Sequence, residues 1–140
     1  MNEEKIKHLE FIQGVINRMN SNSFQIKGWM ITIVAALLAL YASSSNVAYI
    51  FVGIVPTILF WLLDSYYLQQ ERKFRGVYDD VLKDSIPLFN MPIHNYSQGE
   101  YSFCCTFWSK TLMWLYGSVC ACLLVGGLIL KYKDCITIIC

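Results

Sequence analysis

Few side chains in this sequence have the types and spacing that catalysis needs. Two histidines, His8 and His94, lie 86 positions apart, and neither is close in sequence to a cluster of metal ligands or to a nucleophile. The sequence has no glycine-rich phosphate loop, no G-x-S-x-G turn and no H-E-x-x-H motif. We therefore expect no enzyme activity, no metal and no cofactor, and we expect each histidine on the surface or on a helix face.

The cysteines do not form a recognisable metal or redox motif. None of them is part of a C-x-x-C pair, and two lie inside an apolar stretch, where a thiol behaves as a small hydrophobic group. The six are Cys104, Cys105, Cys120, Cys122, Cys135 and Cys140. We interpret them as packing residues and free thiols.

Asp64 is the residue most indicative of function. It directly follows an uncharged run of 36 residues, Gly28–Leu63, and an acidic side chain within a membrane is costly and usually functional. Two interpretations stay open. Asp64 lines or gates a pore together with Pro56, or it has a local structural role and pairs with Lys27 near the lipid headgroups.

The elements that must position these residues are membrane helices. Hydrophobic residues make up 56% of the 140 residues and charged ones 15%, and a second uncharged run covers Thr111–Leu130. About 20 apolar residues suffice for a helix to cross the hydrocarbon core. The first run can hold two short spans and the second holds one. We predict an all-α integral membrane protein with three transmembrane helices.

The pattern of apolar and polar residues divides the chain into five segments. Pro56 is expected to kink the second span, and a turn at Asn20–Ser23 is expected to separate the first segment from the membrane. The segments are a cytoplasmic amphipathic helix (1–23), a transmembrane hairpin that turns at 43–46 (24–67), a cytoplasmic helix extending the second span and followed by an irregular connection (68–106), a third transmembrane helix (107–130) and a short tail (131–140).

The distribution of Lys and Arg predicts the orientation in the membrane. With the N-terminus inside, nine basic residues are cytoplasmic and two, Lys131 and Lys133, are not, which agrees with the positive-inside rule. The expected location is a bacterial inner membrane, with a cytoplasmic N-terminus and an external C-terminus. The net charge of +1 gives no basic bias toward nucleic acid.

Two further groups of residues are candidate contacts. The basic residues Arg72, Lys73 and Arg75 would lie just inside the membrane, where they either bind anionic lipid headgroups or only satisfy the positive-inside rule. Small residues recur at four-residue spacing in the third span and favour close helix packing, within one subunit or between subunits. These are Gly117, Ala121, Cys122 and Gly126.

Several motifs resemble a group of small, mostly uncharacterised bacterial multi-span membrane proteins. The matching pieces are His8–Gln13, Asn17–Met19, Asn22–Phe24, Lys27–Trp29 (Lys-Gly-Trp), Phe60–Tyr67 (Phe-Trp-Leu-Leu-Asp-Ser-Tyr-Tyr) and Gln70–Arg75. The architecture, to which this chain adds a third span, is also similar to that of the SLATT-type transmembrane effectors of prokaryotic defence systems. That resemblance implies a protein that oligomerises and perforates the inner membrane when a partner senses infection.

Two functions from different classes are therefore expected. One is a homo-oligomeric pore-forming or membrane-perturbing effector in antiphage defence, with membrane lipid and a sensor protein as partners. The alternative is a non-conducting accessory or scaffold subunit of a larger membrane complex. A membrane-embedded enzyme is a weaker third hypothesis, because the acidic residues and histidines do not converge on one site.

Overall fold

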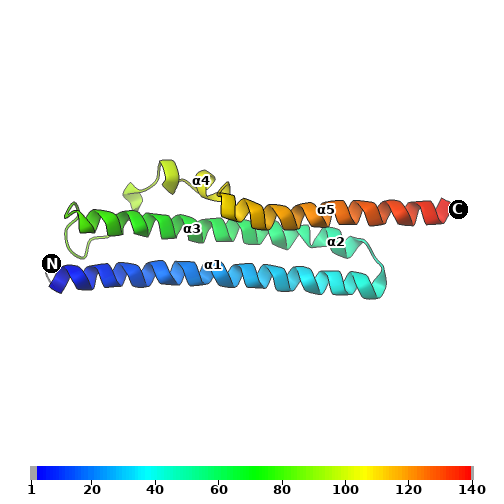
Figure 1. The fold of residues 1–140 in the computed structure, drawn as a ribbon, viewed down its shortest axis with the longest axis horizontal. Coiled ribbons are helices and arrows are strands. Elements are labelled where there is room, and N and C mark those ends of the chain that lie inside the picture. Colours follow the sequence, from blue (N-terminus) through cyan, green and yellow to red (C-terminus); the bar gives the residue numbers. More distant parts are fainter. Residues whose placement is uncertain (1–2, 140) are drawn as a thin grey trace. The chain divides into compact units, whose positions relative to one another are not determined.

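The computed structural model describes residues 3–139, and in this part of the chain every regular element is a helix (Figure 1). The elements in chain order are α1 (Glu3–Ser44), α2 (Ala48–Val52), α3 (Ile54–Leu82), the 3-10 turns η1 (Ile93–Asn95) and η2 (Gly99–Tyr101), α4 (Phe103–Phe107) and α5 (Lys110–Ile139). The predicted all-helical class is confirmed for these residues.

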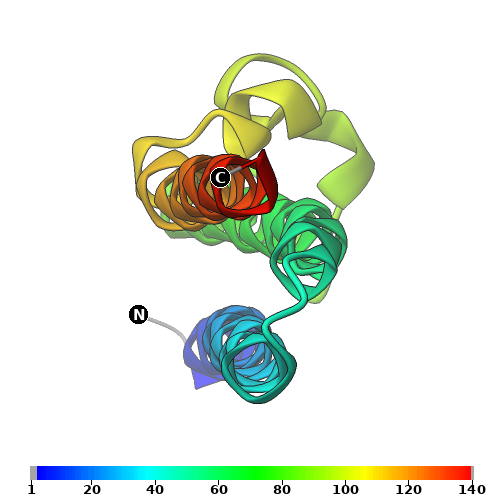
Figure 2. The same ribbon diagram turned by 90° about the vertical axis from the view of Figure 1, so that its right-hand side faces the viewer.

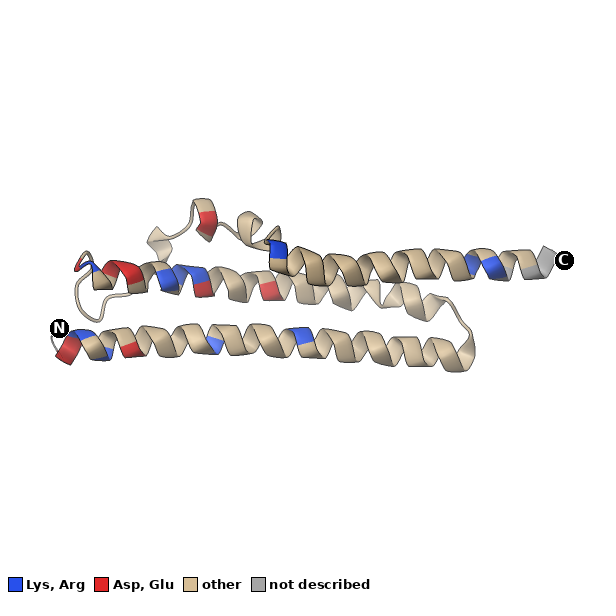
Figure 3. Cartoon of the chain, viewed as in Figure 1, with Lys and Arg blue, Asp and Glu red and all other residues tan. Residues whose placement is uncertain are grey.

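Three helical segments are long and apolar enough to cross a membrane: Glu3–Ser44, Ala48–Leu82 and Lys110–Lys133. Their number agrees with the prediction, and they fit a multi-pass membrane protein. Figure 3 shows the uncharged stretches that these segments contain. With 42 residues, α1 is about 63 Å long, roughly twice the thickness of the hydrocarbon core. If α1 crosses a membrane once, a large part of it extends beyond the hydrocarbon.

The expected turn at Asn20–Ser23 is wrong, because these residues are helical and α1 runs through them without a break. The buried positions of α1 explain why. They recur every three or four residues on both sides of this polar stretch, which keeps one face of the helix in register. The positions are Leu9, Ile12, Ile16, Ser23, Ile26, Met30 and Val34.

The chain forms two compact units. The first consists of Met1–Gln25 and Asp64–Trp108, and the second of Ile26–Leu63 and Ser109–Cys140.

The core of the first unit lies between α1 and α3. Leu9, Ile12 and Ile16 of α1 form one buried cluster with Val77 and Val81 of α3. Burying such a side chain fully contributes about 1.5–3 kcal/mol. The connection after α3 covers this cluster with side chains that are partly buried, namely Ile86, Met91, Ile93 and Tyr96. The predicted helix beyond the second span is confirmed to Leu82, and the connection contains two 3-10 turns and α4 rather than irregular backbone alone.

In the second unit, α2 packs closely on α5 (Figure 2). Gly127 of α5 permits this approach, because a Cβ atom there would lie 2.9 Å from the Phe51 ring. Pro56 was expected to kink the second span. The helix is interrupted about one turn before Pro56, at Gly53 between α2 and α3. Proline has no N–H to donate to Val52, four residues earlier, so a regular helix loses one bond at this point.

The helix that contains the predicted third span, 107–130, has different bounds from that span. The helix α5 begins at Lys110 rather than Phe107, because Phe107 ends α4 and Trp108 is its C-cap. The Ser109 carbonyl accepts the first bond of the new helix, from the Met113 N–H at 2.9 Å. The helix α5 also continues beyond Leu130 to Ile139. No glycine or proline occurs after Gly127 to stop it.

We predict that Gly76→Ala loosens the connection from the first unit. A Cβ atom at this position of α3 would lie 2.8 Å from the Tyr96 ring and 2.9 Å from the Tyr101 hydroxyl. Such overpacking typically costs about 1–3 kcal/mol. Limited proteolysis of the full chain in detergent should cut within 93–101 faster than in the wild type. Gly14→Ala is the matched control, because nothing lies within 4 Å of that position, and it should stabilise α1 by up to about 1 kcal/mol. Equal cleavage of the two variants would contradict the packing described.

Candidate functional site

Asp64 is fully buried in the first unit, and the Ser23 hydroxyl donates a hydrogen bond to its Oδ1. Ser23 is itself buried, and Ser65 beside Asp64 is fully buried as well. A carboxylate removed from water requires a partner of this kind. The contact links α1 to α3. The sequence analysis did not identify Ser23 as a partner, although Ser23 occupies a position in the buried face of α1.

The two candidate gating residues lie in different surroundings. Pro56, which is half-buried, belongs to the second unit, while Asp64 belongs to the first. The buried Asp64 carboxylate accepts a bond within its own unit. Its geometry therefore supports a structural link between two helices in the conformation described.

The basic residues after the second span are partly engaged by the protein. Arg75 forms a two-pronged ion pair with Glu71, with its Nε and terminal nitrogen 2.9 and 2.7 Å from Oε1. Arg72 donates a hydrogen bond of 3.1 Å to the carbonyl of Glu100, which holds the connection against α3. Lys73 is half-buried. At least two of the three candidate headgroup contacts thus also have a role within the first unit.

Shallow polar pockets lie beside these arginines. One, of about 260 Å³, is lined by Gln13, Ile16, Arg75, Tyr78 and Asp79. Another, of about 200 Å³, is lined by Arg72, Arg75, Gly76, Asp79, Glu100 and Tyr101. Neither contains a histidine, cysteine or serine nucleophile. Within residues 3–139, no group of three or more His, Cys, Asp or Glu side chains is placed to bind a metal ion.

Of the two places expected for a histidine, the surface and a helix face, His8 occupies a helix face of α1, where it is fully buried. Its Nδ1 accepts a hydrogen bond of 3.2 Å from the Phe89 N–H, and its ring stacks on Phe89 with centroids 5.5 Å apart. The other ring nitrogen, Nε2, is buried and has no hydrogen-bond partner among the described residues. His94, by contrast, is exposed.

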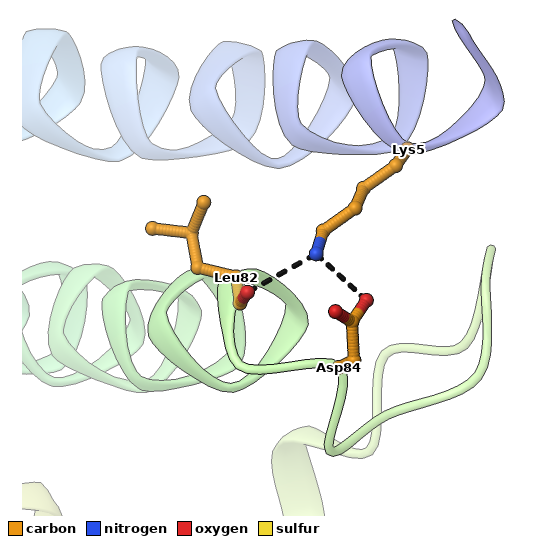
Figure 4. A network of polar contacts seen from close by, with 3 residues as sticks. All are labelled: Lys5, Leu82 and Asp84. Carbon is orange, nitrogen blue, oxygen red and sulfur yellow. Dashed lines mark hydrogen bonds and ion pairs between the residues drawn. The ribbon is translucent and has the colours of Figure 1, made fainter. Parts of the chain in front are cut away.

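Lys5, one turn before His8, contacts the same end of the first unit. Its Nζ donates a hydrogen bond of 3.0 Å to the Leu82 carbonyl, at the end of α3, and pairs with Asp84 at 2.7 Å (Figure 4). We call the contacts of Lys5 and His8 with residues 82–89 the latch. Two latch residues, Asp84 and Phe89, have positive φ angles of 57° and 60°. Such backbone is uncommon for residues other than glycine and persists where surrounding contacts hold it.

The rest of the connection is tied down by Tyr96. Its hydroxyl donates a hydrogen bond of 2.5 Å to Asp80 of α3. Burial raises the pKa of Tyr96, and the hydrogen bond to the Asp80 carboxylate raises it further. The phenol therefore stays protonated and continues to donate this bond at neutral pH.

The four small residues predicted as packing contacts on α5, unlike Gly127, are not used for packing within the subunit. Gly117 and Gly126 have no atom within 4 Å of the position of a Cβ, and Ala121 and Cys122 are exposed. Contacts of these residues between subunits stay a prediction. The described cysteines are free thiols.

We predict that Ser23→Ala destabilises the protein by about 1–3 kcal/mol, because it removes a donor from the buried Asp64 carboxylate. Ser21→Ala is the matched control: Ser21 is exposed on the same helix, and its substitution should have little effect. Thermal unfolding of both variants in detergent measures the difference. Equal midpoints for the two variants would show that the bond to Ser23 contributes nothing.

Comparison with protein-family models, with curated proteins and with solved structures finds no match to this chain.

Proposed function

We propose that this chain is a homo-oligomeric, membrane-perturbing effector of the bacterial inner membrane, which acts in antiphage defence with a sensor protein as its partner. The N-terminus and the latch are on the cytoplasmic side in this proposal. The observation that supports it most is the continuity of α1, which carries residues of the first unit and also a membrane-length apolar segment without a break. The helix α3 also continues from the first unit into the second candidate span, which α2 completes on the other side of the interruption at Gly53.

An uninterrupted helix passes a displacement of one end along its length. The latch joins the start of α1 to the end of α3 through a small number of polar contacts. A partner that binds there and separates the two ends would change how the helices pack further along. The buried bond between Ser23 and Asp64 would be among the contacts that then break, and the Asp64 carboxylate would move to line a pore. In the closed state, the Ser23 hydroxyl donates its hydrogen bond to the Asp64 carboxylate.

A non-conducting scaffold subunit is the second candidate function. Asp64 has a hydrogen-bond partner within its own unit. This structural contact is enough to explain an acidic residue at this position without a pore. An exposed α5 surface could equally contact the subunits of a larger complex. The two functions differ in one measurable property, because only the effector depolarises the membrane.

The proposed orientation predicts the activity of alkaline phosphatase fusions. Fusions after Ser45 and at the C-terminus should be active, because both sites are external. A fusion after Lys83 should be inactive, because Lys83 lies among the cytoplasmic basic residues. Phosphatase activity in colonies measures this, with expression checked by immunoblot. An active Lys83 fusion would contradict the orientation and place the latch outside the cell.

The effector function predicts that cells expressing the wild type depolarise, either on strong induction or on phage challenge, as followed with a voltage-sensitive dye. Asp64→Asn keeps the shape of the side chain but removes its charge, so cation-dependent depolarisation should fall severalfold at matched expression. Ser21→Ala, at an exposed site on α1, should depolarise as the wild type does.

Chemical crosslinking of the same membranes should give discrete oligomers. A wild type that never depolarises cells under either condition would contradict the effector function. The scaffold subunit would then be the remaining candidate function. Depolarisation by a protein that crosslinks only as a monomer would contradict the oligomeric pore. If Asp64→Asn depolarises as well as the wild type, Asp64 does not line the pore.

A further inference from the structure

The helix α5 has one face that packs within the second unit and an opposite face that does not. Leu112, Tyr116, Leu123 and Gly127 are buried and recur at helical spacing on the packed face. The opposite face carries a shallow groove of about 710 Å³. It is lined by Lys110, Met113, Trp114, Gly117, Ser118 and Ala121.

The shape of this groove follows from its residues. Gly117 and Ala121 lie one turn apart and leave a depression, and Trp114 forms a wall beside them with 78% of its surface exposed. The depression is apolar apart from the Ser118 hydroxyl, which donates a hydrogen bond of 2.9 Å to the Leu115 carbonyl of its own helix. An apolar chain could therefore lie in the groove without leaving a polar group unpaired.

A cation stands at one end of the groove. Lys110 is the first residue of α5 and is exposed. Among the described residues its side chain makes no ion pair and no hydrogen bond. The uncharged residues of Thr111–Leu130 follow immediately. This places a single free positive charge where the apolar span begins, at the depth of lipid headgroups.

We propose that this groove binds one anionic phospholipid, with an acyl chain along Trp114, Gly117 and Ala121 and the phosphate at Lys110. A lipid of this class supplies an apolar chain that fits the depression and a negatively charged phosphate that can pair with Lys110. The site requires only that α5 spans the membrane, and it is independent of the effector function.

A second copy of the chain fits this face less well. Copies inserted in one membrane have the same orientation, so a neighbour packed on this face in parallel presents its own Lys110 at the same depth. Two like charges in contact repel each other. The residues of the second unit offer no carboxylate at that level, since Asp134, their only acidic residue, lies 24 positions further along.

Other residues of α5 remain available for contacts between subunits. At 3.6 residues per turn, Cys122 and Gly126 lie about 120° and 160° around the helix from Lys110. Subunits that associate through these two positions would leave the groove open to lipid.

Native mass spectrometry of the full chain tests the site. The protein is reconstituted in vesicles of phosphatidylcholine and phosphatidylglycerol and then released with its bound lipid. The wild type should retain phosphatidylglycerol in preference to phosphatidylcholine, and Lys110→Gln should lower this preference roughly fivefold, the effect of one lysine near a headgroup. Lys131→Gln is the matched control, because Lys131 is exposed on the same helix but lies outside the groove, and it should keep the wild-type preference.

The variant Gly117→Leu distinguishes a bound lipid from a second copy of the chain as the occupant of the groove. The leucine fills the depression without changing the charge. It should reduce retention of both lipids while leaving the crosslinked oligomers unchanged. An unaltered preference in Lys110→Gln would overturn the proposal. So would a Gly117→Leu variant that loses its oligomers and keeps its lipid, since a second copy would then be the occupant.

Discussion

The buried carboxylate of Asp64 is the constraint on which the arrangement of the first unit depends. A charge enclosed in a protein interior must be paired or hydrogen-bonded, and the Ser23 hydroxyl donates one such bond to Asp64. Ser23 can do so only if the buried face of α1 stays in register from Leu9 and Ile12 onward. The apolar cluster with Val77 and Val81 fixes the same register on α3. A single orientation of α1 relative to α3 therefore satisfies both the apolar contacts and the hydrogen bond from Ser23 to Asp64.

The latch imposes a second condition on the same pair of helices. Lys5 and His8 hold the backbone that follows α3, and Asp84 and Phe89 keep their positive φ angles within these contacts. The Asp84 side chain of the ion pair with Lys5 is 80% exposed, and solvent weakens the attraction within such a pair. The latch therefore depends on a few polar contacts, while the cluster beside it is apolar. In the proposed function this difference matters, because a partner can open the polar contacts while the helix pair persists.

The sequence predicted the three membrane helices because long uncharged runs admit few alternatives. It did not predict their ends. Asn20–Ser23 has the composition of a turn, yet the buried face of α1 continues through it. The burial of His8 could not be predicted, because the Phe89 loop that supplies its hydrogen bond lies 81 residues away in sequence. Helical spacing could have suggested a partner for Asp64. Ser23 is a polar residue on the same face of α1 as Ile16 and Ile26. Such pairings between distant segments depend on the packing of α1 on α3, which local patterns do not determine.

The helix α1 is continuous and places the Ser23 hydroxyl in hydrogen-bond contact with Asp64. Amide hydrogen exchange of the full chain in lipid nanodiscs, resolved by mass spectrometry, tests it most directly. The amides of residues 20–25 should exchange slowly, as those of a hydrogen-bonded helix within a packed unit do. Their exchange should be much slower than that of Asn46 and Val47, which lie between α1 and α2. Exchange at residues 20–23 as fast as at Asn46 would show a turn there, and the contact of Ser23 with Asp64 would lose its structural basis.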